Sequence, residues 1–180
     1  MIRRTVMTAR FLLLIPFLAV AVAACGSSDS PDTAGSPAVA PAGEPGPAAP
    51  AAHDGRQIEI TGDDTIKFNI AEMRAKPGER LSVTLINKGQ TPKFSMGHNW
   101  VLLAAGVDAL AFVITAAESP TTDYVPAARK ADILAATKLL GPAEQDTVTF
   151  NAPTAPGRYV FLCSFPGHYQ VGMHGVLIVE

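Results

Sequence analysis

Residues 161 to 175, FLCSFPGHYQVGMHG, join the end of an apolar strand to two tight turns. The segment contains a thiol, an imidazole and a thioether within eleven residues, at Cys163, His168 and Met173. The turn Phe165-Pro166-Gly167 consists of residues that reverse a chain, so we expect it to return His168 toward Cys163. A second turn over residues 169–172 then brings Met173 underneath. This spacing predicts that three side chains of one loop share a metal ion.

A fourth candidate ligand lies far upstream, in SMGHNWVL at residues 95–102, which contains His98. One thiolate and two imidazoles suit copper in both of its common oxidation states. Two histidines and a cysteine in a trigonal set, with a weak axial methionine, form the blue-copper arrangement. The sequence therefore predicts one type 1 copper per chain, held by His98, Cys163, His168 and Met173.

Each of these side chains also has an ordinary explanation when it is taken alone. A free cysteine is often a small buried hydrophobe, and a histidine or methionine can simply occupy the core. One copper site explains all four more simply than four coincidences. Structural zinc sites favour several thiolates or paired histidines, and the short step from Cys163 to His168 is not typical of thiol hydrolases. We expect His174 to point away from the site and His53 to be exposed.

Short strand-like segments surround this loop. Polar and apolar residues alternate over residues 57–60, 65–70 and 81–86, and further short segments follow at residues 100–103, 147–150, 158–162 and 176–179. Glycine and proline separate many of them, which predicts an all-β fold of the sandwich type. Residues 104–140 are Ala-rich and too long for a hairpin loop. Parts of this stretch, especially residues 126–140, favour helix, so we expect a partly helical flap between two strands.

The N-terminus has the pattern of an export signal. Arg3, Arg4 and Arg10 precede an apolar run over residues 11–24 that is short for a membrane span. The run ends in Val-Ala-Ala-Cys, which resembles the lipobox of bacterial lipoproteins, with Cys25 as the lipidated first residue of the mature chain. We therefore expect a lipoprotein signal peptide over residues 1–24; the alternative is a plain signal peptide with an incidental cysteine.

Residues 25–54 follow as a tether of mostly Ala, Pro, Gly and Ser, a composition that cannot bury a core. The folded domain is expected over residues 55–180. The formal net charge of -2 lacks the basic character that nucleic-acid binding requires. The chain has 2 cysteines, Cys25 and Cys163, so a lipidated Cys25 leaves an unpaired thiol in an oxidising compartment. A bond from that thiolate to a metal explains why it persists.

Three segments resemble the azurins, which are bacterial cupredoxins. These segments are SMGHNWVL, TKLLGPAEQDTVTF and FLCSFPGHYQVGMHG, and the likeness runs from about residue 57 to residue 180. The resemblance implies a cupredoxin Greek-key β-sandwich in which residues 104–140 form the helical flap. Lipid-modified azurins with Ala/Pro-rich tethers are similar to the N-terminal half.

The resemblance also assigns roles to single residues. It implies that His98, Cys163 and His168 are equatorial ligands, that Met173 is axial, and that the carbonyl oxygen of Gly97 approaches copper opposite Met173. Asn99 corresponds to a residue whose hydrogen bonds fix the ligand-bearing loops and reach the cysteine sulfur. Phe165 lies where a backbone N–H also points at that sulfur. Hydrogen bonds of this kind tune the metal.

Two features differ from azurins. Four residues, 169–172, separate His168 from Met173, whereas azurins have three; four is similar to the spacing in auracyanins and plastocyanin. The chain also lacks the cysteines of the N-terminal disulfide that azurins normally hold, a bond typically worth about 2–4 kcal/mol.

The expected function is single-electron transfer between redox proteins, of the c-type cytochrome, nitrite reductase or peroxidase class. We expect it in the periplasm or cell envelope, with the lipid anchor in the outer membrane. A copper chaperone or buffer of the periplasm is the alternative. A redox domain of a larger copper enzyme is a third possibility, but such enzymes need further paired histidines and the chain has 4 in all. We therefore do not expect an enzyme.

Overall fold

The structure is a computed structural model that describes residues 54–180. The predicted signal peptide, Cys25, His53 and almost the whole of the predicted tether lie outside the described residues. Within residues 54–180, no helix is long and apolar enough to cross a membrane.

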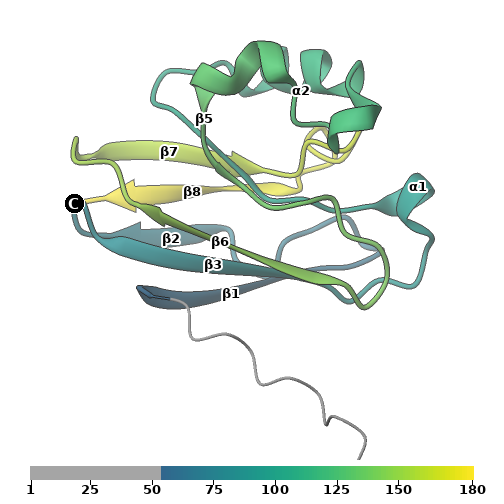
Figure 1. The fold of residues 1–180 in the computed structure, drawn as a ribbon, viewed down its shortest axis with the longest axis horizontal. Helices are drawn as coiled ribbons and strands as arrows, with labels where there is room; N and C mark the ends of the chain where they lie inside the picture. Colours follow the sequence, from purple (N-terminus) through teal and green to yellow (C-terminus); the bar gives the residue numbers. More distant parts are fainter. Residues whose placement is uncertain (1–53) are drawn as a thin grey trace, which may run out of the picture. The chain divides into compact units, whose positions relative to one another are not determined.

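Two β-sheets form the domain (Figure 1). The first contains, in spatial order, β1 (Arg56–Gly62), β3 (Arg80–Asn87) and β6 (Gln145–Asn151). The second contains β2 (Glu72–Ala75), β8 (His174–Val179), β7 (Gly157–Leu162), β4 (Val101–Leu103) and β5 (Ile133–Ala136). β1 pairs with β3 and β2 with β8 in parallel, and the other pairs are antiparallel. The all-β sandwich expected from the sequence is confirmed.

The main core lies between the sheets, because alternate residues of each strand point inward. The ring of Trp100 packs at 5.8 Å from both Phe150 and Phe161. β4 has no such alternation, since all of its residues are buried. Leu102 joins the main core, whereas Val101 and Leu103 face a second cluster on the other side of the sheet. β4 is therefore covered on both faces, which explains its unbroken apolar sequence.

The second cluster is closed by α2 (Ala109–Ala117), which contributes Phe112 and Val113. Asp108 caps this helix, because its carboxylate accepts hydrogen bonds from the backbone N–H groups of Leu110 and Ala111. Figure 1 shows α2 on the outer side of the sheet that contains β7 and β8. The flap is thus anchored by its own apolar core.

The flap is partly helical as expected, but its helices lie elsewhere. The α-helix comes early, at α2, and residues 126–140 contain only a 3₁₀ helix, η2 (Ala127–Asp132), before β5 begins. A shorter 3₁₀ turn, η1 (Pro120–Thr122), lies between α2 and η2. The Ala-rich sequence favours helix locally, yet pairing of β5 with β4 overrides that preference.

The strand predicted over residues 65–70 is wrong. The chain instead turns at Asp63, whose carboxylate accepts hydrogen bonds from the backbone N–H and the hydroxyl of Thr65. Ile66 then has a φ of 58°, and only an isolated bridge joins Gly62 to Phe68. The strand itself comes later, as β2. Side-chain hydrogen bonding by Asp63 favours a turn over an extended chain.

Candidate metal centre

Strand pairing places the candidate ligands at one end of the sandwich. Val101 at the start of β4 pairs with Leu162 at the end of β7. His98 shortly precedes β4 and Cys163 directly follows β7, so the two segments meet. The loop from Cys163 to the start of β8 then supplies His168 and Met173.

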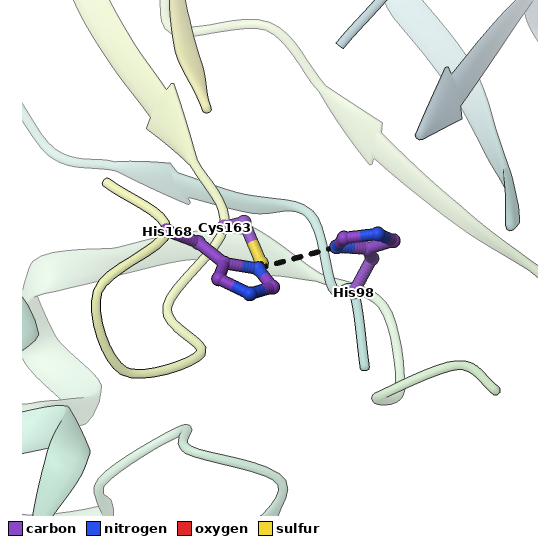
Figure 2. A group of neighbouring side chains, drawn as sticks. All are labelled: His98, Cys163 and His168. Atoms are coloured by element: carbon purple, nitrogen blue, oxygen red, sulfur yellow. Dashed lines mark hydrogen bonds between the residues drawn. The ribbon is translucent and has the colours of Figure 1, made fainter. Parts of the chain in front are cut away.

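Three of the predicted ligands converge on one point. The Nδ1 atoms of His98 and His168 lie 3.2 Å apart, and the Sγ atom of Cys163 lies 3.4 Å from Nδ1 of His168. One ligand atom from each side chain falls within 4.8 Å of the others. Figure 2 shows these side chains pointing toward one another from two separate segments. All three are buried, so solvent does not compete for the donor atoms.

The imidazole of His98 is oriented by main-chain groups. Its backbone N–H donates to the carbonyl of Leu140 at 3.1 Å, and its carbonyl accepts from the N–H of Leu140 at 2.7 Å. Its Nε2 lies 3.0 Å from the carbonyl oxygen of Asp63, to which only an Nε2–H can donate. That tautomer leaves the lone pair of Nδ1 free and directed toward Cys163 and His168.

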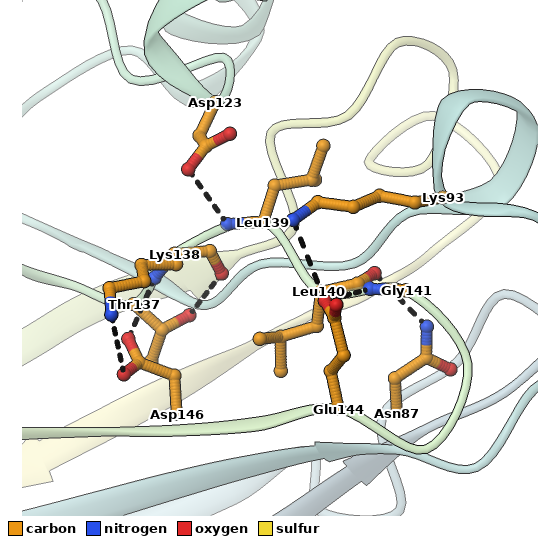
Figure 3. Close-up of polar contacts among 10 residues, drawn as sticks. All are labelled: Asn87, Lys93, Asp123, Thr137, Lys138, Leu139, Leu140, Gly141, Glu144 and Asp146. Atoms are coloured by element: carbon orange, nitrogen blue, oxygen red, sulfur yellow. Dashed lines mark hydrogen bonds and ion pairs between the residues drawn. The ribbon is translucent and has the colours of Figure 1, made fainter.

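The loop that supports His98 is held by its own hydrogen bonds (Figure 3). The carbonyl of Leu140 also accepts from Nδ2 of Asn87 at 3.1 Å. Glu144 accepts from the backbone N–H of Gly141 at 2.7 Å, which closes the turn after Leu140. Asp123 of the flap accepts from the backbone N–H of Leu139 at 3.3 Å. The main chain opposite His98 is therefore fixed on both sides.

The ligand loop is shaped by backbone hydrogen bonds across both of its turns. The N–H of His168 donates to the carbonyl of Phe165 at 3.1 Å, and Gly167 has a φ of 85° that favours glycine. The N–H of Met173 donates to the carbonyl of His168 at 2.9 Å, and that of Cys163 to the carbonyl of Met173 at 3.0 Å. These bonds tie the three candidate ligands into one compact loop.

Met173 is fully buried beneath the site, next to His98. A Cβ atom on Gly62 would lie 2.6 Å from Cε of Met173 and 3.4 Å from Cδ2 of His98. Glycine at this position of β1 leaves room for the methyl group and the ring, and a larger residue would displace the methyl group. The structure therefore places the thioether side chain next to the ring of His98 and defines no bond to a metal.

Burial keeps all three donors uncharged in the copper-free protein. It raises the pKa of the Cys163 thiol to about 12, against the opposing effect of backbone N–H groups of Asn99 and Phe165 directed at the sulfur. Burial, and then the nearby His98, lowers the pKa of His168 to about 4. The pKa of His98 is lowered as well, mainly by burial. Binding of a cation must therefore displace the thiol proton, whereas the imidazoles are already deprotonated at neutral pH.

The residues predicted around the ligands also lie at the site. A Cβ atom on Gly97 would meet the carbonyl oxygen of Lys93 at 2.6 Å, so the tight end of α1 (Lys93–Met96) requires glycine. Asn99 accepts from the backbone N–H of Ser164 at 2.8 Å and donates to its hydroxyl at 2.8 Å. These bonds connect the residue after His98 to the residue after Cys163, which joins the two ligand-bearing segments.

Some groups that position the candidate ligands were not predicted from the sequence. The carbonyl of Asp63 that accepts from His98 and the main chain of Leu140 act through backbone atoms, which leave no side-chain signature. Gly62 had a weak signal, as a glycine at the end of an alternating segment. His174 was expected outside the site; it is exposed, its ring lies 4.9 Å from that of Tyr169, and it is not among the converging donors.

The donor set fits copper. A buried thiol, two converging imidazoles and a buried thioether next to His98 combine soft and borderline ligands, which is the preference of copper in both oxidation states. His98, Cys163 and His168, with Met173 as the weak fourth ligand, would hold the ion.

Comparisons with known proteins agree with this chemistry. A family model described as copper binding proteins of the plastocyanin/azurin family matches residues 56–180. The azurin of Pseudomonas chlororaphis is 33% identical over 127 residues, which cover 69% of this chain and 98% of that protein. Auracyanin-B of Chloroflexus aurantiacus is 46% identical over 83 residues, 46% of this chain, but the match spans only 35% of that relative's length.

Solved structures give the same result. Reduced auracyanin from Roseiflexus castenholzii is 39% identical, with a TM-score of 0.62 over 69% of this chain and 96% of that one. An azurin of Methylomonas sp. strain J is 27% identical, with a TM-score of 0.62 over 69% of this chain and 98% of that one. The fold, the converging donors and these relatives together show that the chain belongs to the plastocyanin/azurin family and is a type 1 blue copper protein that transfers electrons.

Proposed function

We propose that the protein carries single electrons between redox proteins of the cell envelope, and that its partners dock over His168. The observation that carries this proposal is the exposure of the candidate ligands. His168 retains 3% of its surface, whereas His98, Cys163 and Met173 retain 0%. Of the four candidate ligands, His168 is therefore the one that retains exposed surface.

Copper supplies a one-electron couple between Cu(II) and Cu(I). The protein supplies a rigid set of donors, because His98 is hydrogen-bonded through its backbone and its ring. Asn99 and Ser164 hold the two ligand-bearing segments together. Donors that cannot move keep the geometry similar in both oxidation states, which lowers the reorganisation that accompanies electron transfer.

Exposed apolar residues occur in both of the segments that supply the candidate ligands. Phe94 on α1 is 82% exposed and Val171 in the ligand loop is 53% exposed. Pro166 and Gly167, which directly precede His168, are exposed, and Met96 is half-buried. We call these five residues the docking surface. A weak redox encounter buries little area and exchanges quickly, so a small apolar surface without strong ion pairs suits the task.

Charged variants of the docking surface test this proposal. Phe94→Asp and Val171→Asp should each lower the electron-transfer rate with a small c-type cytochrome, on the order of tenfold, because a desolvated charge opposes close contact. Ile114→Asp is the matched control, since Ile114 is 57% exposed on α2, within the flap. The rates are measured by stopped-flow absorption. Equal rates in all three variants would place the docking surface elsewhere.

We also propose that Cys25 carries a lipid that anchors the protein to the outer membrane, facing the periplasm. The lipobox-like sequence and the following Ala/Pro-rich segment support this proposal. In cells that express the full chain, Cys25→Ser should move the copper protein from the outer-membrane fraction to the soluble periplasmic fraction. Recovery of both forms in the soluble fraction would contradict an anchor.

The partners that we propose are proteins of the c-type cytochrome, nitrite reductase or peroxidase class, and we propose no enzymatic activity for the chain itself. The copper-chaperone alternative is not favoured, because the similar proteins are azurins and auracyanins. Buried donors also suit retention of copper better than its delivery to another protein.

A further inference from the structure

The flap contains an unusual turn directly above the metal centre. Asp123 and Tyr124 have φ angles of 57° and 58°, so two consecutive residues other than glycine adopt the left-handed conformation. Aspartate tolerates this region, but a bulky tyrosine rarely adopts it. Such residues persist only where their surroundings hold them, and they are concentrated at functional sites. The groups that hold this turn therefore indicate its role.

Both carbonyl oxygens of the turn are bound by residues of the metal centre. Nδ2 of Asn99 donates to the carbonyl of Asp123 at 2.9 Å, and the hydroxyl of Ser164 donates to the carbonyl of Tyr124 at 2.7 Å. Asn99 and Ser164 are fully buried and bonded to each other. The turn therefore belongs to the same network that joins the two ligand-bearing segments.

The side chain of Asp123 extends this network to a third segment. Its carboxylate accepts from the backbone N–H of Leu139, as Figure 3 shows. The side chain of Leu139 fits against Gly97, where a Cβ atom would lie 2.9 Å from its Cγ. The turn thus contacts supports on both sides of His98.

The ring of Tyr124 connects the turn to His168. It meets the ring of Phe165 edge-on, with centroids 5.1 Å apart and planes at 68°. Phe165 in turn lies against the imidazole of His168, with centroids 4.6 Å apart. Edge-to-face and offset contacts of this kind have preferred geometries, so each ring restricts the orientation of the next.

We propose that Tyr124 is a positioning residue for the copper centre: through Phe165 its ring fixes the orientation of His168. The flap is then part of the scaffold of the metal site as well as a cover over the sheet. This role concerns the centre itself and does not depend on which partner docks or on where the protein is located. It accounts for the left-handed backbone at a tyrosine, because this turn places the ring against Phe165.

Three variants separate the ring from the rest of the side chain. Tyr124→Phe keeps the ring, and among residues 54–180 the Tyr124 hydroxyl has no hydrogen-bond partner, so this variant should match the parent protein. Tyr124→Leu removes the ring. Tyr124→Gly removes the ring and also the backbone strain, which keeps the protein folded if the leucine variant is too unstable.

Phe112→Leu is the control for general loosening of the flap. Phe112 is a fully buried residue of α2 in the second core cluster, and within residues 54–180 no ring contact joins it to Phe165 or His168. Its replacement should lower the stability of the flap, but it leaves in place the ring contacts that run from Tyr124 through Phe165 to His168.

Two measurements report on His168. In the copper-free protein, cross-relaxation between the ring protons of Phe165 and His168 should weaken in Tyr124→Leu and Tyr124→Gly and persist in the other two variants. In the copper-loaded protein, the reduction potential should shift and electron self-exchange should slow about threefold to tenfold in the same two variants. Parental cross-relaxation and potential in Tyr124→Gly would overturn the proposal. Equal changes in Phe112→Leu would also overturn it, because they would show general loosening.

Discussion

The regions around His98 and His168 hold their imidazole rings in position in different ways. The ring of His98 is held by a hydrogen bond to the carbonyl of Asp63. Its backbone N–H and carbonyl both form hydrogen bonds with the backbone of Leu140. The ring of His168 is held by contact with Phe165, and its backbone lies in a turn next to exposed residues. His98 is fixed by hydrogen bonds to the backbone of Asp63 and Leu140, and the His168 imidazole is fixed by packing within the ligand loop.

Because of this difference, we expect one region to contribute mainly to the stability of the domain and the other to the access of redox partners to copper. Hydrogen bonds to the main chain of Asp63 and Leu140 hold His98 in the interior of the domain, where its exposed fraction is 0%. Packing within the loop leaves 3% of the His168 surface exposed, and this is the point at which we propose that electrons enter and leave. The region of His98 should therefore govern folding, and the region of His168 should govern exchange.

The largest expected effect comes from removal of each imidazole in turn. His98→Ala leaves a cavity in a fully buried site and should destabilise the copper-free protein by about 3 kcal/mol. His168→Ala should cost about 1 kcal/mol, because water can reach the vacated position at the surface. Urea unfolding of both copper-free variants measures the difference. An equal or larger loss for His168→Ala would reverse the comparison.

The second effect concerns acid. The pKa of His168 is about 4 in the folded protein, against an ordinary value of 6.5, so the unfolded chain takes up the proton first. The stability of the copper-free protein should therefore fall as pH decreases from about 6.5 toward 4. His98, whose pKa is also lowered, contributes in the same direction.

Urea midpoints at pH 7, 5.5 and 4.5 measure this slope, and His168→Ala should reduce it. The carboxylates provide an internal reference, because Asp63 and Asp64 have lowered pKa values and lose their stabilising effect only at more acidic pH. A flat profile between pH 6.5 and 4.5 would show that His168 is readily protonated in the folded chain.

The region of His168 was the easier one to predict from sequence. Cys163, His168 and Met173 lie within one short loop, so their spacing alone brings them together. The short apolar-rich segments separated by glycine and proline also predicted most strands. His98 was identified by residue type and by the resemblance of its surroundings, because nothing local shows which distant loop it meets.

The backbone structure around His98 could not be predicted from the sequence. Residues 65–70 alternate as a strand does, yet the hydrogen bonds of the Asp63 side chain produce a turn. β5 was predicted as helix, because pairing with β4 is a tertiary effect that Ala-rich sequence does not encode. Tyr124 lies in the same stretch, and its contact with Phe165 depends on a left-handed turn that has no glycine to mark it.

The smallest expected effect compares one glycine from each region. In Gly62→Ala the new Cβ would lie 2.6 Å from the methyl group of Met173, the flexible end of a side chain that can move. The thioether should shift, which alters the relative intensities of the thiolate-to-copper absorption bands at a cost in stability below about 1 kcal/mol.

In Gly167→Ala the Cβ meets nothing within 4 Å, but the φ of 85° is unfavourable for alanine. That variant should lose about 1 kcal/mol and keep the parental spectrum. A changed spectrum in Gly167→Ala alone would mean that backbone strain in the loop, and not contact with Met173, controls the centre.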